Sequence, residues 1–557
     1  MRERKEDNNV LVGLAALIGC IAFILIYGVT VLNPVYDDWL LGQGDLTQHY
    51  LGWCFYRRSD WTVPIGLANN LAYPSYTSVI FTDSIPLLAV LFKVLSPFLP
   101  ETFQYFGWWG ILSFALQGYF SAKILQEFLS GKLQILIGSI FFIVSPIVIE
   151  RMFRHTALGG HWLILIAIYL FIRHKKDYQN WIKTTLCWGG LGALIAAIHL
   201  YFLPMCGAFL CGYLLCSILR DKKIHLNRFL PGVSFVGAIG LVTYLLGGFS
   251  TRATSSADGL GECSFNLNGF FNEKGYSRFF NALPMYHESQ YEGFAYLGFG
   301  IFILAAIAVL FMLVETVRKR GRWLQDYFVE LLSGSLISIG LILFAASPMV
   351  TWNNKLLFIL TDSSTLTNYW SIFRATGRVV WPVCYLIYFV VIVCNGKLWS
   401  IFFKKSTVAS VVTTLVLAGC CFLQIFDISE RLAGQREWLE EKSVYKSSLQ
   451  DEVWDLLAKQ ENLEHFVWVS NNFENRQILE MAKWAYDNRL TMNIFYFARG
   501  ISVIEDTQYC LSNPNDTYVF VFTQEEITEY LDCGLNFYKA DEYIVGTTFM
   551  LDHERYE

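Results

Sequence analysis

Charged residues are scarce in this sequence. Asp, Glu, Lys and Arg make up 16% of the 557 residues, whereas an ordinary soluble chain carries about 25%. So few charges cannot cover the surfaces of the three or four soluble domains that this length would otherwise allow. Hydrophobic residues make up 54%, which also excludes a disordered chain. The composition therefore predicts a polytopic membrane protein.

Several functional signatures are missing as well. The formal net charge is −5, and there is no sign of the basic face that a nucleic-acid partner would require, so we expect none. No CxxC pair and no Cys/His cluster has the spacing of a zinc site. The thirteen cysteines lie mostly in apolar stretches, where they act as small apolar residues. We expect no disulfide framework.

Long apolar runs fill most of the first three quarters of the chain. The first covers residues 10–32 after a charged N-terminus and has no small-residue cleavage site, so we expect an uncleaved first span. Most of the later runs approach the roughly 20 residues that a helix needs to cross a bilayer. They cover residues 103–125, 133–149, 159–172, 184–198, 205–219, 229–248, 294–314, 328–346, 379–393 and 408–425.

One further run makes the number of spans ambiguous. Residues 85–99 form a shorter apolar segment that contains Lys93 and is interrupted by Pro97. Counted as a full span, it would place the later basic loops outside. We therefore interpret it as a half-span or interfacial helix and expect eleven full spans; a twelfth span is the alternative.

Basic residues in alternate loops predict the orientation, because short cytoplasmic loops are enriched in Lys and Arg. The N-terminus is then cytoplasmic, and the long loops 33–84, 249–291 and 347–378 face outward from the cytoplasmic (inner) membrane. The basic clusters are Arg2/Arg4/Lys5, Arg173/Lys175/Lys176/Lys183, Arg220/Lys222/Lys223/Arg228, Arg318/Lys319/Arg320/Arg322 and Lys397/Lys404/Lys405.

The last 130 or so residues change character. Segments 453–457 and 476–489 have helical periodicity, and 524–531 is expected to be a further helix. Segments 465–469, 517–522 and 543–551 are rich in Val, Phe and Tyr and are typical of strands. We expect a transmembrane helical domain over residues 1–426 and a small extracytoplasmic α/β domain over 427–557.

The first outward loop carries an acidic candidate site. Its carboxylates include Asp38, Asp45 and Asp83. If residues 45–56 form a helix, Asp45, Gln48 and His49 share one face, because positions i, i+3 and i+4 are neighbours. Asp45 would lie at the helix start, where a carboxylate suits the exposed N–H groups. The alternative is a simple helix cap beside interfacial aromatic residues.

Charged residues at two other outer boundaries form a second group. Arg151, Arg154, His155 and His161 lie where the positive-inside pattern would not place them, and charge at such positions tends to be functional or paired. The alternative is a snorkelling cluster. Glu292 lies where the chain re-enters the membrane. The alternative interpretation is that its carboxylate only stabilises a helix N-terminus.

A third group is an arginine pair. Arg374 and Arg378 are four residues apart, so on a helix they would point the same way. Two guanidinium groups on one face suit bidentate phosphate binding. The alternatives are interfacial anchoring and an ion pair with an acidic residue such as Asp362 or Glu292.

Three sequence strings resemble those of a known family. They are GDLTQHYLGW at 44–53, YEGFAYLG at 291–298 and FRATGRVVWP at 373–382. With the acidic outer loop after the first span, they resemble the GT-C superfamily of integral-membrane glycosyltransferases. Within it, the chain resembles an uncharacterised bacterial family near the YfhO-like and mannosyltransferase-like branches. The resemblance covers residues 10–425 and implies a GT-C-like helical bundle.

The resemblance also implies an activity. Members transfer a sugar from a polyprenyl-phosphate donor at the outer face, usually with inversion. An acidic residue of the first outer loop acts as base or as ligand of a divalent cation such as Mg²⁺ or Mn²⁺. By position this residue is Asp45, with Asp38 second. A lipid-linked-saccharide flippase or transporter and a non-catalytic scaffold are the alternatives, and the sequence does not name the sugar.

The chemistry of the candidate residues is compatible with that activity. A carboxylate such as Asp45 can take the proton of an acceptor hydroxyl. Arginines can stabilise the charge of a departing phosphate. We expect Arg374 and Arg378 in this role, joined by Arg151 or Arg154. The residues expected to bind substrate are Gln48, His49, Asp83, His155, His161 and Glu292. The expected partners are the bilayer, the sugar donor and a glycan, lipid or protein acceptor.

Overall fold

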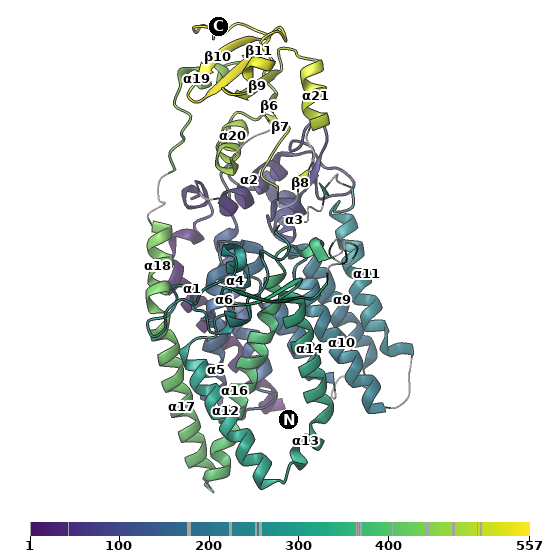
Figure 1. Ribbon diagram of the computed structural model, residues 1–557, viewed down its shortest axis with the longest axis vertical. Coiled ribbons are helices and arrows are strands. Elements are labelled where there is room, and N and C mark those ends of the chain that lie inside the picture. Colours follow the sequence, from purple (N-terminus) through teal and green to yellow (C-terminus); the bar gives the residue numbers. More distant parts are fainter. Residues whose placement is uncertain are drawn as a thin grey trace.

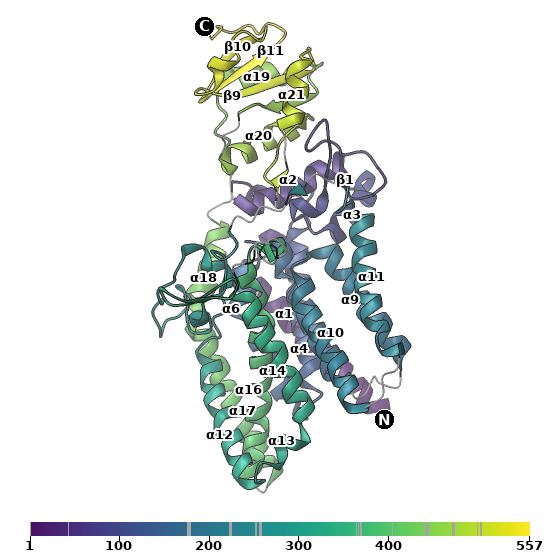
Figure 2. The ribbon, with the colours of Figure 1, turned by 45° about the vertical axis from the view of Figure 1, so that its right-hand side comes forward.

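The structure is a computed structural model. It describes residues 2–42, 44–174, 180–221, 226–250, 253–254, 259–361, 363, 365, 367, 370–403, 405–440, 445–470, 474–497, 500–501 and 504–556. A long helical bundle forms the lower part, and a small domain with a β-sheet is stacked on its upper end (Figures 1 and 2). The start of α1 and the C-terminal domain lie at opposite ends of the molecule (Figure 2).

The bundle is that of a membrane protein. Among the described residues, eight helical segments are long and apolar enough to cross a membrane. They are Asn9–Tyr27 in α1 (Arg2–Tyr27), Lys132–Arg151 in α5 (Lys132–Ile143) and α6 (Pro146–Arg151), α9 (Trp181–Ile198), Phe202–Leu219 in α10 (Phe202–Asp221), α12 (Phe299–Arg318), α14 (Phe328–Ala345), Thr376–Phe402 in η10 (Thr376–Val380) and α16 (Trp381–Phe402), and α17 (Ser406–Asp427).

The other three expected spans are helical but fall short of that length or apolar character. They are α4 (Phe106–Leu125), α7 (Trp162–Ile172) and α11 (Leu230–Leu245). The ambiguous run after residue 85 forms α3 (Pro86–Leu95) and the short turn η4 (Ser96–Phe98). Its ten-residue helix is too short to span a bilayer by itself. The number of eleven spans stays a prediction.

Glycines allow the helices of the bundle to approach closely. A Cβ on Gly19 of α1 would lie 2.1 Å from the carbonyl oxygen of Phe114 in α4, and one on Gly118 of α4 would lie 2.2 Å from that of Ala15. Only glycine fits at such backbone contacts, which are typical of helix pairs in membranes. The α1–α4 pair therefore forms a fixed base for the loops that follow each helix.

Shorter elements lie in the loops that connect the helices of the bundle. The first loop contains α2 (Gly44–Arg58). The other short elements between residues 28 and 440 are η1 (Thr30–Leu32), η2 (Asp38–Leu40), β1 (Leu67–Ala68), β2 (Thr77–Ser78), η3 (Val79–Thr82), η5 (Thr156–Gly159), η6 (Leu226–Arg228), β3 (Ala253–Thr254), η7 (Leu267–Phe270), η8 (Glu288–Gly293), α13 (Arg322–Asp326), β4 (Met349–Trp352), β5 (Lys355–Ile359), η9 (Ser371–Phe373) and α18 (Ser429–Glu440).

The C-terminal domain is a small α/β unit. Its sheet has the order β10-β11-β9-β6-β7. Strand β6 runs parallel to its neighbours β7 and β9, and strand β11 runs antiparallel to its neighbours β9 and β10. Its elements are α19 (Glu452–Ala458), β6 (His465–Trp468), α20 (Asn475–Asp487), β7 (Thr491–Met492), β8 (Gly500–Ile501), α21 (Ile504–Ser512), β9 (Tyr518–Thr523), η11 (Ile527–Glu529), β10 (Asn536–Ala540) and β11 (Tyr543–Thr547).

The sequence patterns located most of this domain. The three expected strands correspond to β6, β9 and β11, and two of the three expected helices to α19 and α20. The helix expected over 524–531 was wrong, because the chain forms only the three-residue turn η11 there. β9 and β10 run in the same direction on either side of β11, so the chain between them must return to the other end of the sheet, and Gly534 with φ +80° lies in this connection.

One basic loop lies at the end of the bundle opposite the C-terminal domain. Residues 318–322, between α12 and α13, lie at the same end as the N-terminus (Figures 1 and 2). This arrangement is the one that the positive-inside rule predicts for cytoplasmic loops. Lys175, Lys176, Lys222, Lys223 and Lys404 of the other basic clusters lie outside the described residues.

Candidate functional site

The site begins on α2, which confirms the helix expected over 45–56. Asp45 lies in its first turn and His49 lies one turn later. The Asp45 Oδ2 atom is 3.3 Å from His155 Nε2, and His49 Nδ1 is 3.2 Å from Thr156 Oγ1. Both residues therefore face the loop between α6 and α7. Gln48, between them in this face, is buried.

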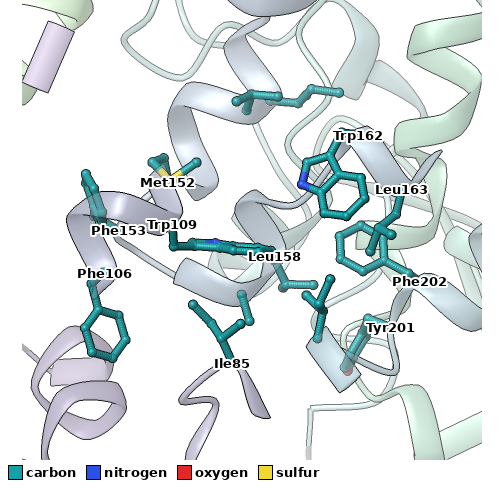
Figure 3. Close-up of a cluster of buried hydrophobic side chains, with 14 of the residues drawn as sticks. Ile85, Phe106, Trp109, Met152, Phe153, Leu158, Trp162, Leu163, Tyr201 and Phe202 are labelled. Atoms are coloured by element: carbon teal, nitrogen blue, oxygen red, sulfur yellow. The ribbon is translucent and has the colours of Figure 1, made fainter. Parts of the chain in front are cut away.

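The loop between α6 and α7 is held from below by an apolar cluster. Figure 3 shows Trp109, Phe153, Leu158 and Trp162 packed together at this point. Trp109 donates a hydrogen bond from its indole nitrogen to the carbonyl oxygen of Thr156 at 2.7 Å. Phe153 has φ +63°, a conformation that a bulky residue adopts only when its surroundings enforce it. This packing sets the position of His155.

Glu292 is the centre of a buried ion network. Its Oε2 atom accepts from Arg378 Nε at 2.8 Å and lies 2.9 Å from Arg151 Nη1. The three side chains are 6%, 8% and 1% exposed, respectively. Burial alone would raise the pKa of Glu292, but the charges of Arg378 and Arg151 outweigh it and hold that pKa well below its usual range. Glu292 is therefore a carboxylate that joins two arginines.

Arg378 also fixes the state of His155. Its Nη2 atom lies 2.7 Å from His155 Nε2, and a guanidinium group can only donate. Burial and the positive charge of Arg378 lower the pKa of His155 well below its usual value. The ring is therefore neutral, accepts at Nε2 and carries its proton on Nδ1. It has no proton at Nε2 to give to Asp45.

Asp45 receives its hydrogen bond from the C-terminal domain instead. The hydroxyl of Tyr496 donates to Asp45 Oδ1 at 3.1 Å. The Asp45 side chain is 30% exposed. Burial raises the pKa of Tyr496, the negative charge of Asp45 raises it further, and the charge of Arg374 opposes both. Asp45 and Arg374 are thus both within electrostatic reach of one hydroxyl.

The two arginines of the expected pair have different surroundings. Ala375, with ψ 63°, separates η9 from η10, so Arg374 and Arg378 do not lie on one continuous helix. The expectation of a shared face was wrong for a steric reason: the turn brings Gly377 against Gly293, and a Cβ on Gly377 would lie 2.7 Å from the Gly293 Cα. Arg378 turns inward to Glu292.

Arg374 remains exposed beside the site. Among the described residues it has no ion-pair partner. Asp362, the other acidic partner considered for this pair, lies outside the described residues. Of the four arginines expected to bind phosphate, Arg151, Arg154 and Arg378 form ion pairs within the described part of the chain and Arg374 does not.

Arg154 is engaged in a separate cluster. It forms an ion pair with Glu150 and lies 4.9 Å from the centre of the Tyr291 ring. Glu150 also accepts from the hydroxyl of Tyr276 at 2.6 Å and lies 3.5 Å from Arg431 of α18. This cluster ties the α6–α7 loop to the helix that leads into the C-terminal domain.

Two further candidates lie away from Asp45. His161 is fully buried, with Nδ1 2.7 Å from the hydroxyl of Tyr385 and its ring stacked on Trp381. It belongs to the interior of the bundle. Asp38, in η2, accepts a hydrogen bond from the backbone nitrogen of Tyr445 at 3.4 Å, and so contacts the chain that enters the C-terminal domain.

Asp83 is paired with a histidine that the sequence analysis missed. Its Oδ1 atom is 3.4 Å from His199 Nε2. Burial would raise the pKa of Asp83, but His199, His49 and His155 together lower it well below its usual value. Asp83 also has φ +52°. One signal was available. His199 lies in the short turn between the predicted spans 184–198 and 205–219, and the predicted orientation places this turn on the outer side.

The donors around Asp45 do not form a metal-binding group. Among the described residues, no three or more His, Cys, Asp or Glu side chains are arranged to hold a metal ion. The histidine closest to Asp45 already accepts from Arg378 through the nitrogen that faces the carboxylate. The described side chains therefore do not fit the expected Mg²⁺ or Mn²⁺.

The fold and the site together define a helical membrane protein with an acidic, histidine- and arginine-containing cluster on its end loops. The chain belongs to the DUF6311 family, described as a domain of unknown function, whose model matches residues 16–429. The model of the DUF6311 C-terminal domain matches residues 453–548. No curated protein matches the chain.

Proposed function

We propose that this protein is a membrane glycosyltransferase that moves a sugar from a polyprenyl-phosphate donor to an acceptor at the outer face of the cytoplasmic membrane. The observation that carries the proposal is the partly exposed carboxylate of Asp45, which lies beside His155 and accepts from Tyr496, together with the exposed Arg374, whose charge acts on the same tyrosine. A base and a phosphate-binding cation are what such a transfer needs from the protein. The resemblance to GT-C enzymes supports the same reaction.

Asp45 is the proposed general base. Its carboxylate takes the proton of the acceptor hydroxyl while the acceptor oxygen forms a bond to the anomeric carbon of the sugar. The bond between that carbon and the phosphate oxygen breaks, and its electron pair leaves with the polyprenyl phosphate. The configuration at the anomeric carbon is inverted. The neutral His155 beside Asp45 does not compete for this proton, because its Nε2 accepts from Arg378.

Arg374 is the proposed partner of the departing phosphate. The charge on the phosphate grows as the bond breaks, and a guanidinium fork matches its oxygens. Arg378 and Arg151 contribute indirectly, because they hold Glu292 and keep the loops in place. Gln48, His49 and Asp83 line the same region of the first outer loop and are proposed to contact the sugar.

The test is sugar transfer by the full chain in lipid nanodiscs. A panel of polyprenyl-phosphate sugars would be supplied, and the released polyprenyl phosphate would be measured. Asp45→Asn keeps the size of the side chain but removes its charge, so turnover should fall roughly 10²-fold or more. Asp532→Asn changes an exposed aspartate of the C-terminal domain and should not alter turnover.

Three results would reject the proposal or its assignment of the base. The first is that no donor of the panel reacts with the wild-type chain. The second is normal turnover in Asp45→Asn, which would move the base to Asp38 or Asp83. The third is transport of a lipid-linked sugar across the bilayer without chemical change, which would favour the flippase hypothesis.

The outward orientation of the site is part of the proposal. It is supported by the basic residues 318–322 at the end of the bundle opposite the C-terminal domain. A reporter that is active only on the outer side of the membrane should be active when it is fused after the last residue. If only a reporter that requires the cytoplasm is active, the topology is the opposite of the proposed one, and the site lies on the wrong side for a donor at the outer face.

A further inference from the structure

One segment of the C-terminal domain crosses the site, and we refer to residues 491–497 as the strap. Its beginning is the edge strand β7, which is extended by the first outer loop. The amide of Tyr73 donates to the Met492 carbonyl at 2.8 Å, and the amide of Met492 donates to the Asn70 carbonyl at 2.9 Å. The strap is thereby anchored to the same loop that carries Asp45.

The chain after the strap is anchored to another outer loop. The short strand β8 pairs antiparallel with β3, whose residues belong to the loop after α11. The strap therefore lies between two anchoring points on two different loops. Tyr496 is located between these points, and Figure 1 shows β7 above α2 and β8 beside it.

Tyr496 is half-buried and remains a hydrogen-bond donor. Burial and the negative charge of Asp45 raise its pKa above the ordinary value for a phenol, so the hydroxyl keeps its proton. The other close neighbour of Asp45, His155, has no proton at the nitrogen that faces the carboxylate. Among the described residues, Tyr496 is thus the donor that fixes the Asp45 carboxylate.

We propose that Tyr496 is a positioning residue that the C-terminal domain contributes to the site: its hydroxyl holds Asp45 Oδ1 and leaves Oδ2 directed toward the acceptor. This inference rests on the proposed function for the role of Asp45. It gives the C-terminal domain a direct part in the chemistry, because the site on the membrane domain is incomplete without the strap.

The first test does not depend on any enzymatic activity. Asp45 in the purified full chain is labelled with a water-soluble carbodiimide and an amine, and the rate is measured by mass spectrometry at one fixed pH. Tyr496→Phe removes only the hydroxyl. Labelling of Asp45 should become about three- to tenfold faster, because the net contribution of one partly exposed hydrogen bond is of that order. Unchanged or slower labelling overturns the proposal.

A matched variant controls for the loss of any tyrosine hydroxyl. Tyr509→Phe changes an exposed tyrosine of α21 in the same domain and should leave Asp45 labelling unchanged. The apparent melting temperature should be the same for both variants and the wild type. Equal acceleration in Tyr509→Phe would indicate a general loosening of the domain and would overturn a specific role of Tyr496.

The second test separates positioning from substrate binding. With a donor that the wild-type chain accepts, Tyr496→Phe should lower kcat about three- to tenfold and leave KM unchanged, because the hydroxyl acts on Asp45 and not on the substrate. A raised KM with normal kcat overturns the positioning role. Faster labelling of Asp45 in a chain that transfers no sugar would reject the proposed function while leaving the contact between Tyr496 and Asp45 established.

Discussion

Arg378 donates two hydrogen bonds to Glu292, from Nε to Oε2 at 2.8 Å and from Nη2 to Oε1 at 2.9 Å. This bidentate pair is buried at the end of the bundle. It joins η8, which precedes α12, to η10, which precedes α16. The close approach of Gly293 and Gly377 beside it shows that the two turns are packed backbone to backbone. The pair therefore holds the loops that frame the site.

Removal of the Glu292 charge should destabilise the protein. Glu292→Gln leaves Arg151 and Arg378 buried without a counter-charge, and breaking such a pair costs about 3–5 kcal/mol. The apparent melting temperature of the full chain in nanodiscs should fall clearly. Glu288→Gln, an exposed glutamate of the same turn η8, is the control and should melt like the wild type. Equal stability of all three proteins would contradict the network.

Lysine substitutions should separate the roles of the two arginines. Arg378→Lys keeps the charge but loses the bidentate geometry to Glu292, so it should lower stability and leave polyprenyl-phosphate binding per folded molecule unchanged. Arg374→Lys changes an exposed side chain, so the fold should remain intact while binding of polyprenyl phosphate weakens. Arg322→Lys, at the opposite end of the bundle, serves as control. Unchanged affinity in Arg374→Lys rejects its phosphate role.

Lys274 should make stability depend on pH. Burial, followed by the nearby charge of Arg151, lowers the pKa of Lys274 from 10.5 to about 7. The unfolded chain therefore binds this proton more readily than the folded chain, and the resulting penalty is largest below pH 7 and declines as pH rises toward 10.5. Lys274→Met should raise the melting temperature at pH 6 and raise it less at pH 9. Lys539→Met, an exposed site, should show no such trend.

Arg58 should hold the C-terminal domain on the first outer loop. Its guanidinium lies 3.6 Å from the centre of the Tyr486 ring and also donates to the Tyr486 carbonyl. Arg58→Ala should increase hydrogen–deuterium exchange at the amides of Tyr73 and Met492, which bridge the loop and the sheet edge. Arg57→Ala is the matched neighbour, because Arg57 instead binds the loop after α3. The same exchange increase in both variants would argue against a specific role of Arg58.

The helices of the bundle and the strands of the C-terminal domain were predictable because their signals are local. A long apolar run indicates a span whatever lies on either side of it. The run of Val, Phe and Tyr from Tyr518 to Phe522 likewise indicates a strand whatever its partners are. The helix that carries Asp45 and His49 was predictable for the same reason. The helix expected over 524–531 had a weak local pattern, and the connection that carries the chain back from the end of β9 to the start of β10 forms only the turn η11 there.

The sequence by itself determined that the chain is a helical membrane protein, that a small domain with strands lies near its C-terminal end, and that Asp45 lies on a helix in the loop after the first span. Only the tertiary structure decided which charges meet. Glu292 reaches Arg378 across 86 positions, and Tyr496 reaches Asp45 across 451. Hydropathy and periodicity act over a few helical turns, whereas an ion pair or a side-chain hydrogen bond depends on where distant segments pack. For that reason Arg374 and Arg378, alike in sequence, differ in the structure.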